Sequence, residues 1–324
     1  MRVLLTGASG MLGRATAAAL IARGDAVTVL QRRPAGVPGA DEVLGDVADA
    51  SRVADAAAGA DVVLHLAAKV DVVGPEPEYR RVNVDGTRAV LDACRAAGVG
   101  RLVFVSSPSV AHAGDPLMGV GAGPADPAAA RGAYSRTKAE AERLALAADG
   151  PDLAVLAVRP HLVWGPGDTQ LIGRIVQRAR AGRLVLVGTG AALIDTTYVD
   201  NAADALVAAA DAVAPDRVHG EALVVSNGEP RPVGEVLDRV CRAAGVPRPT
   251  RQVPLPVAAA AGTVAQTAWA LLRRRDTPPL TRFLAEQLGT AHWFDQRRTR
   301  EALRWQPRVS LDEGFDRLAA ALRG

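Results

Sequence analysis

The stretch TGASGMLG, residues 6–13, decides the fold class of this chain of 324 residues. Its three glycines, Gly7, Gly10 and Gly13, directly follow an apolar run and directly precede an alanine-rich helical run. In that context the first glycine permits a tight turn, the second lets the backbone approach a pyrophosphate, and the third allows close helix packing. The start of the following helix supplies amide donors and a positive dipole for phosphates. The pattern predicts a dinucleotide-binding loop, and an ordinary tight turn is the alternative.

Short β-branched runs alternate with longer helical runs through the first half of the chain. We predict strands at 3–7, 26–30, 61–67, 102–107 and 154–160, and helices at 13–24, 84–99 and 133–148. Several strands are apolar at consecutive positions, as is typical of strands covered by helices on both faces. This alternation predicts an α/β fold with a Rossmann-type doubly wound parallel sheet.

Beyond about residue 163 proline becomes frequent and the alternation fades. The predicted organisation is a cofactor-binding domain over 1–162, with a returning segment around 195–226, and a smaller C-terminal substrate lobe over 163–324. A terminal helix is also predicted, because Ser310 and Glu313 have the spacing of a capping box.

The composition excludes several classes of protein. The 38 Lys and Arg against 35 Asp and Glu give a net charge of +3 with the signs interspersed, so no nucleic-acid partner is expected. Cys94 and Cys241 have no second Cys or His at ligand spacing, so neither a disulfide framework nor a metal site is expected, and a reducing cytoplasm fits best. The apolar stretch 257–272 predicts a buried or interfacial helix and no transmembrane span. Peripheral membrane contact and a homodimer stay open.

The second predicted strand indicates which dinucleotide binds. It ends in VTVLQRR, residues 27–33, without the Asp or Glu that would accept the ribose 2′-hydroxyl of NAD. Arg32 or Arg33 could instead pair with a 2′-phosphate, so NADP(H) is preferred, with NAD(H) as the alternative. Both arginines could equally be solvated surface residues. Asp46, followed by Val47, is a candidate for the adenine side or a simple loop cap.

A tyrosine and one of the chain's two lysines are spaced for catalysis. Tyr134 precedes Lys138 by four positions, and residues four apart share one face of a helix. A tyrosine of ordinary pKa near 10 is a poor acid–base catalyst, but a fixed cation stabilises its phenolate and lowers that pKa. We therefore expect Lys138 to lower the pKa of Tyr134. A solvated helical pair is the alternative.

The fourth predicted strand ends in VFVSSPS, which places Ser106, Ser107 and Ser109 at the carboxyl edge of the sheet, where ligands bind in open α/β folds. A hydroxyl there can donate a hydrogen bond to a carbonyl oxygen that gains negative charge during reduction. Serines also cap helices and turns routinely.

Taken together, these motifs resemble the extended branch of the short-chain dehydrogenase/reductase superfamily. The matching residues are TGxxGxxG at 6–13, HLAA at 65–68, NVDGT at 83–87, SS at 106–107 and YSRTK at 134–138, so the resemblance covers essentially the whole chain. It implies that Tyr134 is the general acid, Lys138 its cofactor-bound partner, Ser107 the oxyanion-side donor and Asn83 a support of the active site. It also implies cofactor contacts at Thr6, Gly7, Ser9, Gly10, Met11, Leu12, Gly13, Leu66, Ala67, Ala68, Lys69, Pro160 and Leu162.

Two departures argue against the nucleotide-sugar epimerases and dehydratases of that branch. In RPHLVWGPGD, residues 159–168, Leu162 and Trp164 stand where those enzymes usually have Asn and Tyr, and Leu193 and Ile194 stand where they tend to have an arginine. The same segments are similar to the 3β-hydroxysteroid dehydrogenase-like group, which includes bacterial 2-alkyl-3-oxoalkanoate reductases.

The resemblance to that group implies reversible hydride transfer between NADPH and a bulky apolar ketone or secondary alcohol. Ser109, His161 and Trp164 are expected in the substrate pocket. An epimerase or dehydratase, and a non-catalytic NADP(H)-sensing regulator, remain the alternatives. The Gly- and Pro-rich segment 111–131 is interpreted as a lid over the substrate, or as a plain surface connector.

Overall fold

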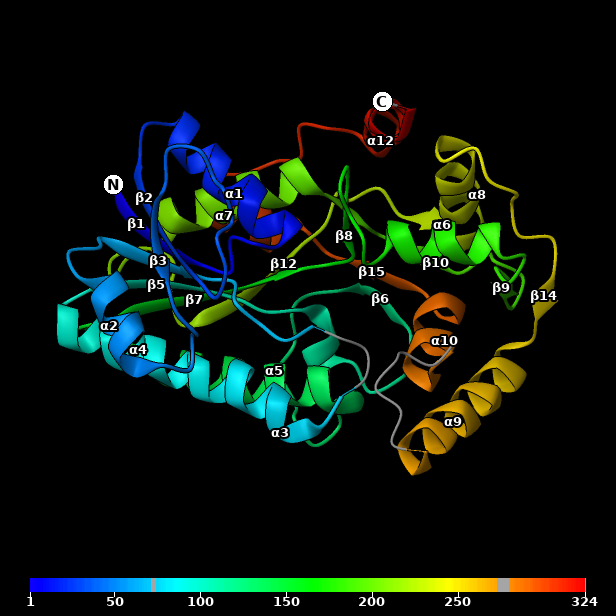
Figure 1. The fold of residues 1–324 in the computed structure, drawn as a ribbon, viewed down its shortest axis with the longest axis horizontal. Helices are drawn as coiled ribbons and strands as arrows, with labels where there is room; N and C mark the ends of the chain where they lie inside the picture. The colour runs from blue at the N-terminus through cyan, green and yellow to red at the C-terminus, as the bar shows by residue number, and fades with distance from the viewer. Residues whose placement is uncertain (71–73, 273–279, 324) are drawn as a thin grey trace.

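The computed structural model describes residues 1–70, 74–272 and 280–323. Its centre is a sheet of seven parallel strands in the order β12-β7-β5-β4-β1-β2-β3 (Figure 1), which confirms the predicted doubly wound sheet. The strands are β1 (Arg2–Thr6), β2 (Ala26–Gln31), β3 (Asp41–Leu44), β4 (Val62–His65), β5 (Arg101–Val105), β7 (Ala154–Pro160) and β12 (Glu221–Val225).

Helices cover both faces of this sheet because successive strand side chains point to opposite sides. Val3 and Leu5 pack with α1 (Met11–Ala22) and α7 (Val199–Ala212) on one face. Leu4 packs on the other face with α2 (Ala50–Ala57), α4 (Gly86–Ala97) and α5 (Gly132–Leu146). Both α7 and β12 fall within the segment predicted to return to this domain, 195–226.

A second, smaller sheet has the order β13-β10-β15-β6. Its strands are β6 (Leu117–Val120), β10 (Leu193–Ile194), β13 (Arg231–Pro232) and β15 (His292–Phe294), and two further pairs join β8 (Val163–Trp164) to β11 (Thr197–Tyr198) and β9 (Leu186–Val187) to β14 (Gln252–Val253). The remaining helices are α3 (Glu76–Tyr79), a π-helical turn (Arg80–Asp85), a 3₁₀ turn (Pro108–Ala111), α6 (Ile172–Arg180), α8 (Val233–Ala243), α9 (Leu255–Leu271), α10 (Arg282–Gly289), α11 (Arg297–Leu303) and α12 (Leu311–Arg323).

The segment 111–131 differs from the expected lid. It contains β6, which pairs in parallel with β15. The carbonyl of Ala122 accepts a hydrogen bond from the guanidinium of Arg159 in β7, and Arg131 forms an ion pair with Glu286 of α10 at 2.8 Å. The segment is therefore anchored at several points to both parts of the fold.

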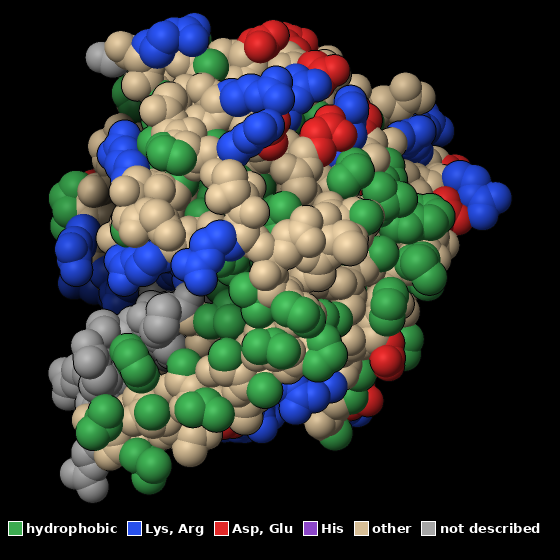
Figure 2. Space-filling view, turned by 90° about the vertical axis from the view of Figure 1, so that its right-hand side faces the viewer, with side chains coloured by type: hydrophobic (Ala, Val, Ile, Leu, Met, Phe, Trp, Pro, Cys, Tyr) green, Lys and Arg blue, Asp and Glu red, His purple; other side chains and the backbone are tan. Residues whose placement is uncertain are grey.

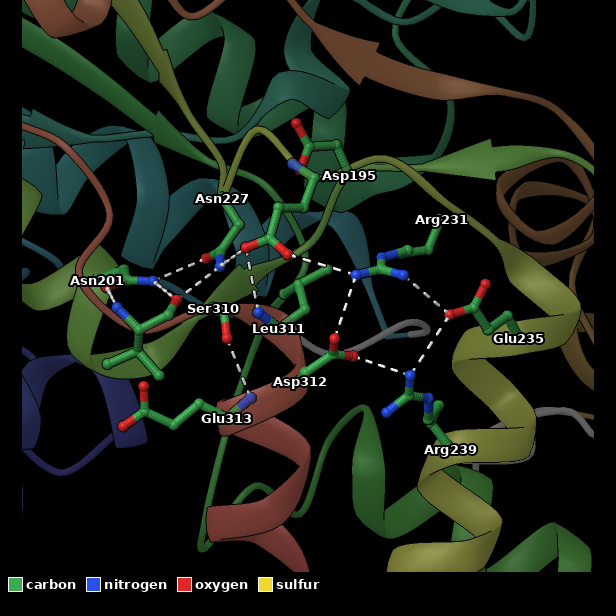
Figure 3. Close-up of polar contacts among 12 residues, drawn as sticks. Asp195, Asn201, Asn227, Arg231, Glu235, Arg239, Ser310, Leu311, Asp312 and Glu313 are labelled. Carbon is green, nitrogen blue, oxygen red and sulfur yellow. Dashed lines mark hydrogen bonds and ion pairs between the residues drawn. The ribbon is translucent and has the colours of Figure 1, made fainter.

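A polar network attaches the C-terminal helix both to α7 and to the second lobe (Figure 3). Asn201 donates a hydrogen bond from Nδ2 to the carbonyl of Val309 at 2.7 Å, and Arg239 of α8 contacts Asp312 at 2.9 Å. The hydroxyl of Ser310 accepts the backbone N–H of Glu313 at 3.2 Å, which gives the predicted N-terminal cap of α12.

The predicted helix over 257–272 is α9, which lies at the edge of the molecule beside α10 (Figure 1). Within 1–70, 74–272 and 280–323, no helix combines the length and the apolar character needed to cross a bilayer. Cys94 and Cys241 are both buried and free.

Candidate active site

A cavity of about 540 Å³ opens at the carboxyl ends of the central strands, where the chain order reverses between β1 and β4. Such a switch point is where open α/β sheets bind ligands. The lining residues come from both lobes: Gly7, Ser9, Gly10, Met11, Leu12, Gly13, Leu30, Gln31, Arg32, Gly45, Asp46, Val47, Leu66, Ala67, Ala68, Val70, Val82, Val105, Ser106, Ser107, Tyr134, Lys138, Pro160, Leu162, Val163, Asp168, Gln170 and Leu171.

The glycine loop at one end of the cavity has no room for side chains. Gly7 has φ +85°, and a Cβ there would lie 2.7 Å from the backbone nitrogen of Ala67. A Cβ on Gly13 would lie 2.3 Å from the carbonyl oxygen of Gly7. The turn can therefore form only with glycine at both positions, and it presents the start of α1 to the cavity.

Two buried polar atoms on the cavity wall agree with a bound polar ligand. The hydroxyl of Ser106 and Oε1 of Gln31 have no hydrogen-bond partner within the part of the chain that the structure describes. Unpartnered buried polar groups are costly in a folded protein unless a ligand or water satisfies them. Together with the glycine loop, they fit a dinucleotide.

At the edge of the cavity beside β2 lie two of the residues predicted for the adenine side, Arg32 and Asp46, whereas Arg33 is exposed and does not line the cavity. Burial opposes ionisation of Asp46, but hydrogen bonds from the N–H of Ala48 and from Arg81 lower its pKa. Arg32 also favours the carboxylate electrostatically. This edge of the cavity therefore carries both signs of charge, the carboxylate of Asp46 and the guanidinium of Arg32.

Lys69, which the resemblance places beside the nicotinamide, lies in an adjoining pocket. Its ammonium is 3.2 Å from the carboxylate of Glu78 and 5.2 Å from the ring centre of Tyr79. The side chain is thus directed toward α3 and away from the main cavity.

The reactive end brings Tyr134 and Ser107 together. Tyr134 lies in the first turn of α5, and its phenol shares a hydrogen bond with the hydroxyl of Ser107, which caps the 3₁₀ turn after β5. Burial raises the pKa of Tyr134 to about 12, and the hydrogen bond to Ser107 opposes the shift only partly. The phenol is therefore protonated at neutral pH, which differs from the lowered pKa that the spacing predicted.

Lys138 lies one turn further along α5 and is almost fully buried. Its Nζ donates to the carbonyl of Val105 at 2.6 Å and lies 4.1 Å from the ring centre of Phe104. Burial lowers the pKa of Lys138 to about 7, partly opposed by the carboxylate of Glu142. The lysine and the tyrosine thus line one cavity, as predicted from their spacing.

Asn83 and Thr6 stand behind the cavity wall. Asn83 accepts the backbone N–H of Lys69 at 2.8 Å and donates to the hydroxyl of Thr137 in α5 at 3.0 Å. Thr6 accepts the backbone N–H of Ala67 at 3.1 Å. Both side chains therefore position the wall, and neither lines the cavity.

None of the three residues predicted for the substrate pocket lines the main cavity. Trp164 is buried in the core of the second lobe, where it stacks on Phe315 at 4.5 Å between ring centres. His161 is buried with its Nδ1 2.6 Å from the carbonyl oxygen of Asp195. Ser109 hydrogen-bonds to Ser107 at 3.0 Å and does not line the cavity. Trp164 is thus held by apolar packing, His161 by a hydrogen bond to the backbone and Ser109 by a hydrogen bond to a side chain.

The sequence reasoning missed two features of the site. Asp168, Gln170 and Leu171, at the start of α6, complete the cavity from the second lobe. Asp168 accepts three backbone N–H groups of that turn, and an Asp ahead of an apolar helical run was a usable signal. The second feature is the fully buried ion pair of Glu142 with Arg159. No local sequence pattern predicts it, because the two residues lie on different elements.

Comparison with known proteins agrees with this geometry. The model of the 3-beta hydroxysteroid dehydrogenase/isomerase family matches residues 4–257. A protein of Stenotrophomonas maltophilia named 2-alkyl-3-oxoalkanoate reductase is 44% identical, with 99% of each chain covered. A protein of the same name from Shewanella oneidensis is 38% identical, with 98% of this chain and 85% of the relative covered.

Among solved structures, MoeE5 in complex with UDP-glucose and NAD is 28% identical and superposes with a TM-score of 0.75 over 100% of this chain and 99% of that one. The cavity beside the glycine loop, the Tyr134–Ser107–Lys138 arrangement and these matches lead to one conclusion. The chain belongs to the 3-beta hydroxysteroid dehydrogenase/isomerase family of NAD(P)-dependent oxidoreductases.

Proposed function

We propose that the protein reduces the ketone of an apolar 2-alkyl-3-oxo acid to a secondary alcohol with NADPH. The observation that carries this proposal is the meeting of a protonated phenol, Tyr134, with Ser107 and Lys138 on one wall of a cavity that also contains the glycine loop. When bound, the nicotinamide cofactor would supply the hydride that reduces the ketone. The chain itself supplies the proton and the groups that orient the ketone.

The roles of the three side chains follow from their chemistry. Tyr134 carries a proton at neutral pH, so it can donate that proton to the carbonyl oxygen as the oxygen becomes an alkoxide. Ser107 is a second donor beside it and stabilises the same oxygen. Lys138 adds a cation whose ammonium can reach ribose hydroxyls.

The substrate class is supported by the two relatives named 2-alkyl-3-oxoalkanoate reductase and by the apolar character of the lining. Leu162, Val163 and Leu171 contribute aliphatic side chains from the second lobe. Leu193 and Ile194 stand where diphosphate sugars would need a cation, which argues against an epimerase. An alkyl chain is the better complement to such a wall.

The choice of NADPH rests on Arg32. Its side chain lines the cavity, and the preceding Gln31 is neutral, so β2 does not end in the carboxylate that would repel a 2′-phosphate. An Arg32→Ala variant should weaken NADPH binding about tenfold and change NADH binding little, because only NADPH carries the phosphate. Arg33→Ala, one residue away and exposed, is the matched control. Equal or tighter binding of NADH by the unaltered protein would overturn the assignment.

NADPH oxidation by the purified protein tests the substrate class. The protein is offered three sets of ketones: 2-alkyl-3-oxo acids, 3-ketosteroids and keto-sugar nucleotides. We expect turnover with the first set, and loss of that turnover in Tyr134→Phe. Turnover confined to keto-sugar nucleotides would reject the proposed substrate, and NADPH binding without turnover in any set would favour a sensing role.

A further inference from the structure

Helix α9 leaves an apolar stripe uncovered. Val257, Val264 and Leu271 are 55%, 68% and 79% exposed, and their spacing of seven residues puts them on one side of the helix. A different side, with Ala258 and Gly262, is buried, and a Cβ on Gly262 would lie 2.5 Å from the backbone nitrogen of Arg282 at the start of α10. The helix is therefore packed on the protein along one side and apolar toward the outside.

The lack of charge on α9 distinguishes this stripe from ordinary exposed aliphatic residues. Residues 255–272 contain no Asp, Glu, Lys or Arg. A helix on the surface of a globular protein normally carries charged residues opposite its packed side. Figure 2, which looks onto this side of the molecule, shows hydrophobic side chains gathered over the lower part of the face, where α9 lies. Exposed apolar side chains gathered on one face in this way are typical of an interaction site.

Arginines border this apolar area on two neighbouring stretches of chain. Strand β9 pairs in parallel with β14, and the N–H of Leu186 donates to the carbonyl of Arg251 at 2.9 Å. The stretch before β9 therefore runs beside the stretch that leads into α9. These stretches carry the exposed arginines Arg180, Arg183, Arg248 and Arg251.

The positive charge of this border is not compensated within the part of the chain that the structure describes. None of those four arginines has a carboxylate at ion-pair distance there, whereas Arg231, Arg239 and Arg242, on and just before α8, all do. Half-buried Arg178 lies close to Arg174 and Arg183. Burial is the main reason that its pKa is lowered, and the positive charges of these two neighbours lower it further. Cations crowded in this way favour an anionic partner.

We propose that this face docks on an anionic phospholipid bilayer, with the α9 stripe in the boundary between headgroups and acyl chains and the arginine border on the lipid phosphates. An apolar helix side next to basic residues is the pattern of an interfacial membrane contact. A second copy of the chain fits less well, because a symmetric contact through this face would bring the arginine borders together. The proposal goes beyond the proposed reaction and stands or fails separately from it.

Vesicle flotation of the full chain tests the proposal. We expect binding to vesicles that contain about one third phosphatidylglycerol, weak binding to pure phosphatidylcholine, and a marked loss between about 50 and 500 mM salt, because salt screens the arginines. Val264→Glu and the double variant R180E/R183E should each bind at least about tenfold more weakly. The matched controls are Leu322→Glu on α12, where the side chain is 48% exposed, and Arg143→Glu on α5. Both controls should bind as the unaltered protein does.

Thermal melting and NADPH binding, measured on every variant, separate loss of docking from loss of fold. Three outcomes would overturn the proposal: no binding to anionic vesicles, equal binding to neutral ones, or the same loss in the control variants. A chain that ignores vesicles but forms a dimer that Val264→Glu dissociates would show that a second copy covers the stripe.

Discussion

Replacing Lys138 with methionine should stabilise the protein while removing its activity. The ammonium is buried and its pKa falls from 10.5 to about 7, first because of burial. Between those two pH values the unfolded chain binds a proton that the folded chain lacks, so folding stability rises with pH across that window. At and below about pH 7 the folded protein bears nearly the whole cost of the buried charge.

The size of the effect follows from the two pKa values. Their difference corresponds to about 5 kcal/mol at pH 6 and about 2 kcal/mol at pH 9, so the pH-dependent part is about 3 kcal/mol. Methionine removes this cost and also removes the hydrogen bond to Val105, a loss of about 1 kcal/mol that does not vary with pH. Lys138→Met should therefore exceed the unaltered protein in stability at pH 6, and the gain should shrink by about 3 kcal/mol at pH 9.

Urea unfolding at both pH values, followed by circular dichroism without cofactor, measures this difference. His65, whose pKa Lys138 helps to lower after the larger effect of burial, titrates at about 3, below this pH range, and the pKa of Tyr134, about 12, lies above it. A variant less stable than the unaltered protein at pH 6, or a gain that is the same at both pH values, would refute the reasoning.

Three further predictions concern the site and its supports. Tyr134→Phe should lower kcat about 10²- to 10⁴-fold without changing NADPH affinity, as measured by turnover and fluorescence titration, because it removes the donated proton and leaves the fold intact. Gly13→Ala should abolish NADPH binding in the same titration, since its Cβ would lie 2.3 Å from the Gly7 carbonyl oxygen. Glu142→Gln should cost about 3–5 kcal/mol in urea unfolding by leaving Arg159 buried without a counter-charge. A smaller loss in a double variant that also replaces Arg159 with methionine would support that cause, and equal losses would contradict it.

The central sheet was predictable from the sequence because its strands are buried on both faces and therefore read as continuous apolar runs. Strand β3, Asp41–Leu44, was not among the predicted strands, because an edge strand exposes most of its side chains and loses that signal. The glycine loop was predictable for a related reason. Gly7 and Gly13 have no room for a Cβ, so the local geometry requires glycine at both positions, and this requirement is visible in the sequence.

The second lobe could not be predicted in the same way, because contacts between distant residues build it. Strand β6 pairs with β15, which lies more than 170 positions later, and nothing in the sequence of residues 117–120 predicts that pairing. The Gly and Pro content of 111–131 suggested a lid, whereas the anchoring contacts come from β15, Arg159 and α10. Trp164 looked like a pocket residue from its motif, but its partners Tyr198 and Phe315 come from far along the chain.

Glu142 connects helix α5 with the segment 111–131 through Arg159. It lies one turn beyond Lys138 on α5, where it pairs with Arg159 and also favours the charged form of the lysine. The same arginine donates to the carbonyl of Ala122, so it links α5, β7 and the segment that leads to the second sheet. Because Glu142 raises the pKa of Lys138 against the larger effect of burial, loss of this carboxylate should lower that pKa further. Direct contacts and charge thus connect the segment 111–131 with Lys138 through Arg159 and one buried carboxylate, Glu142.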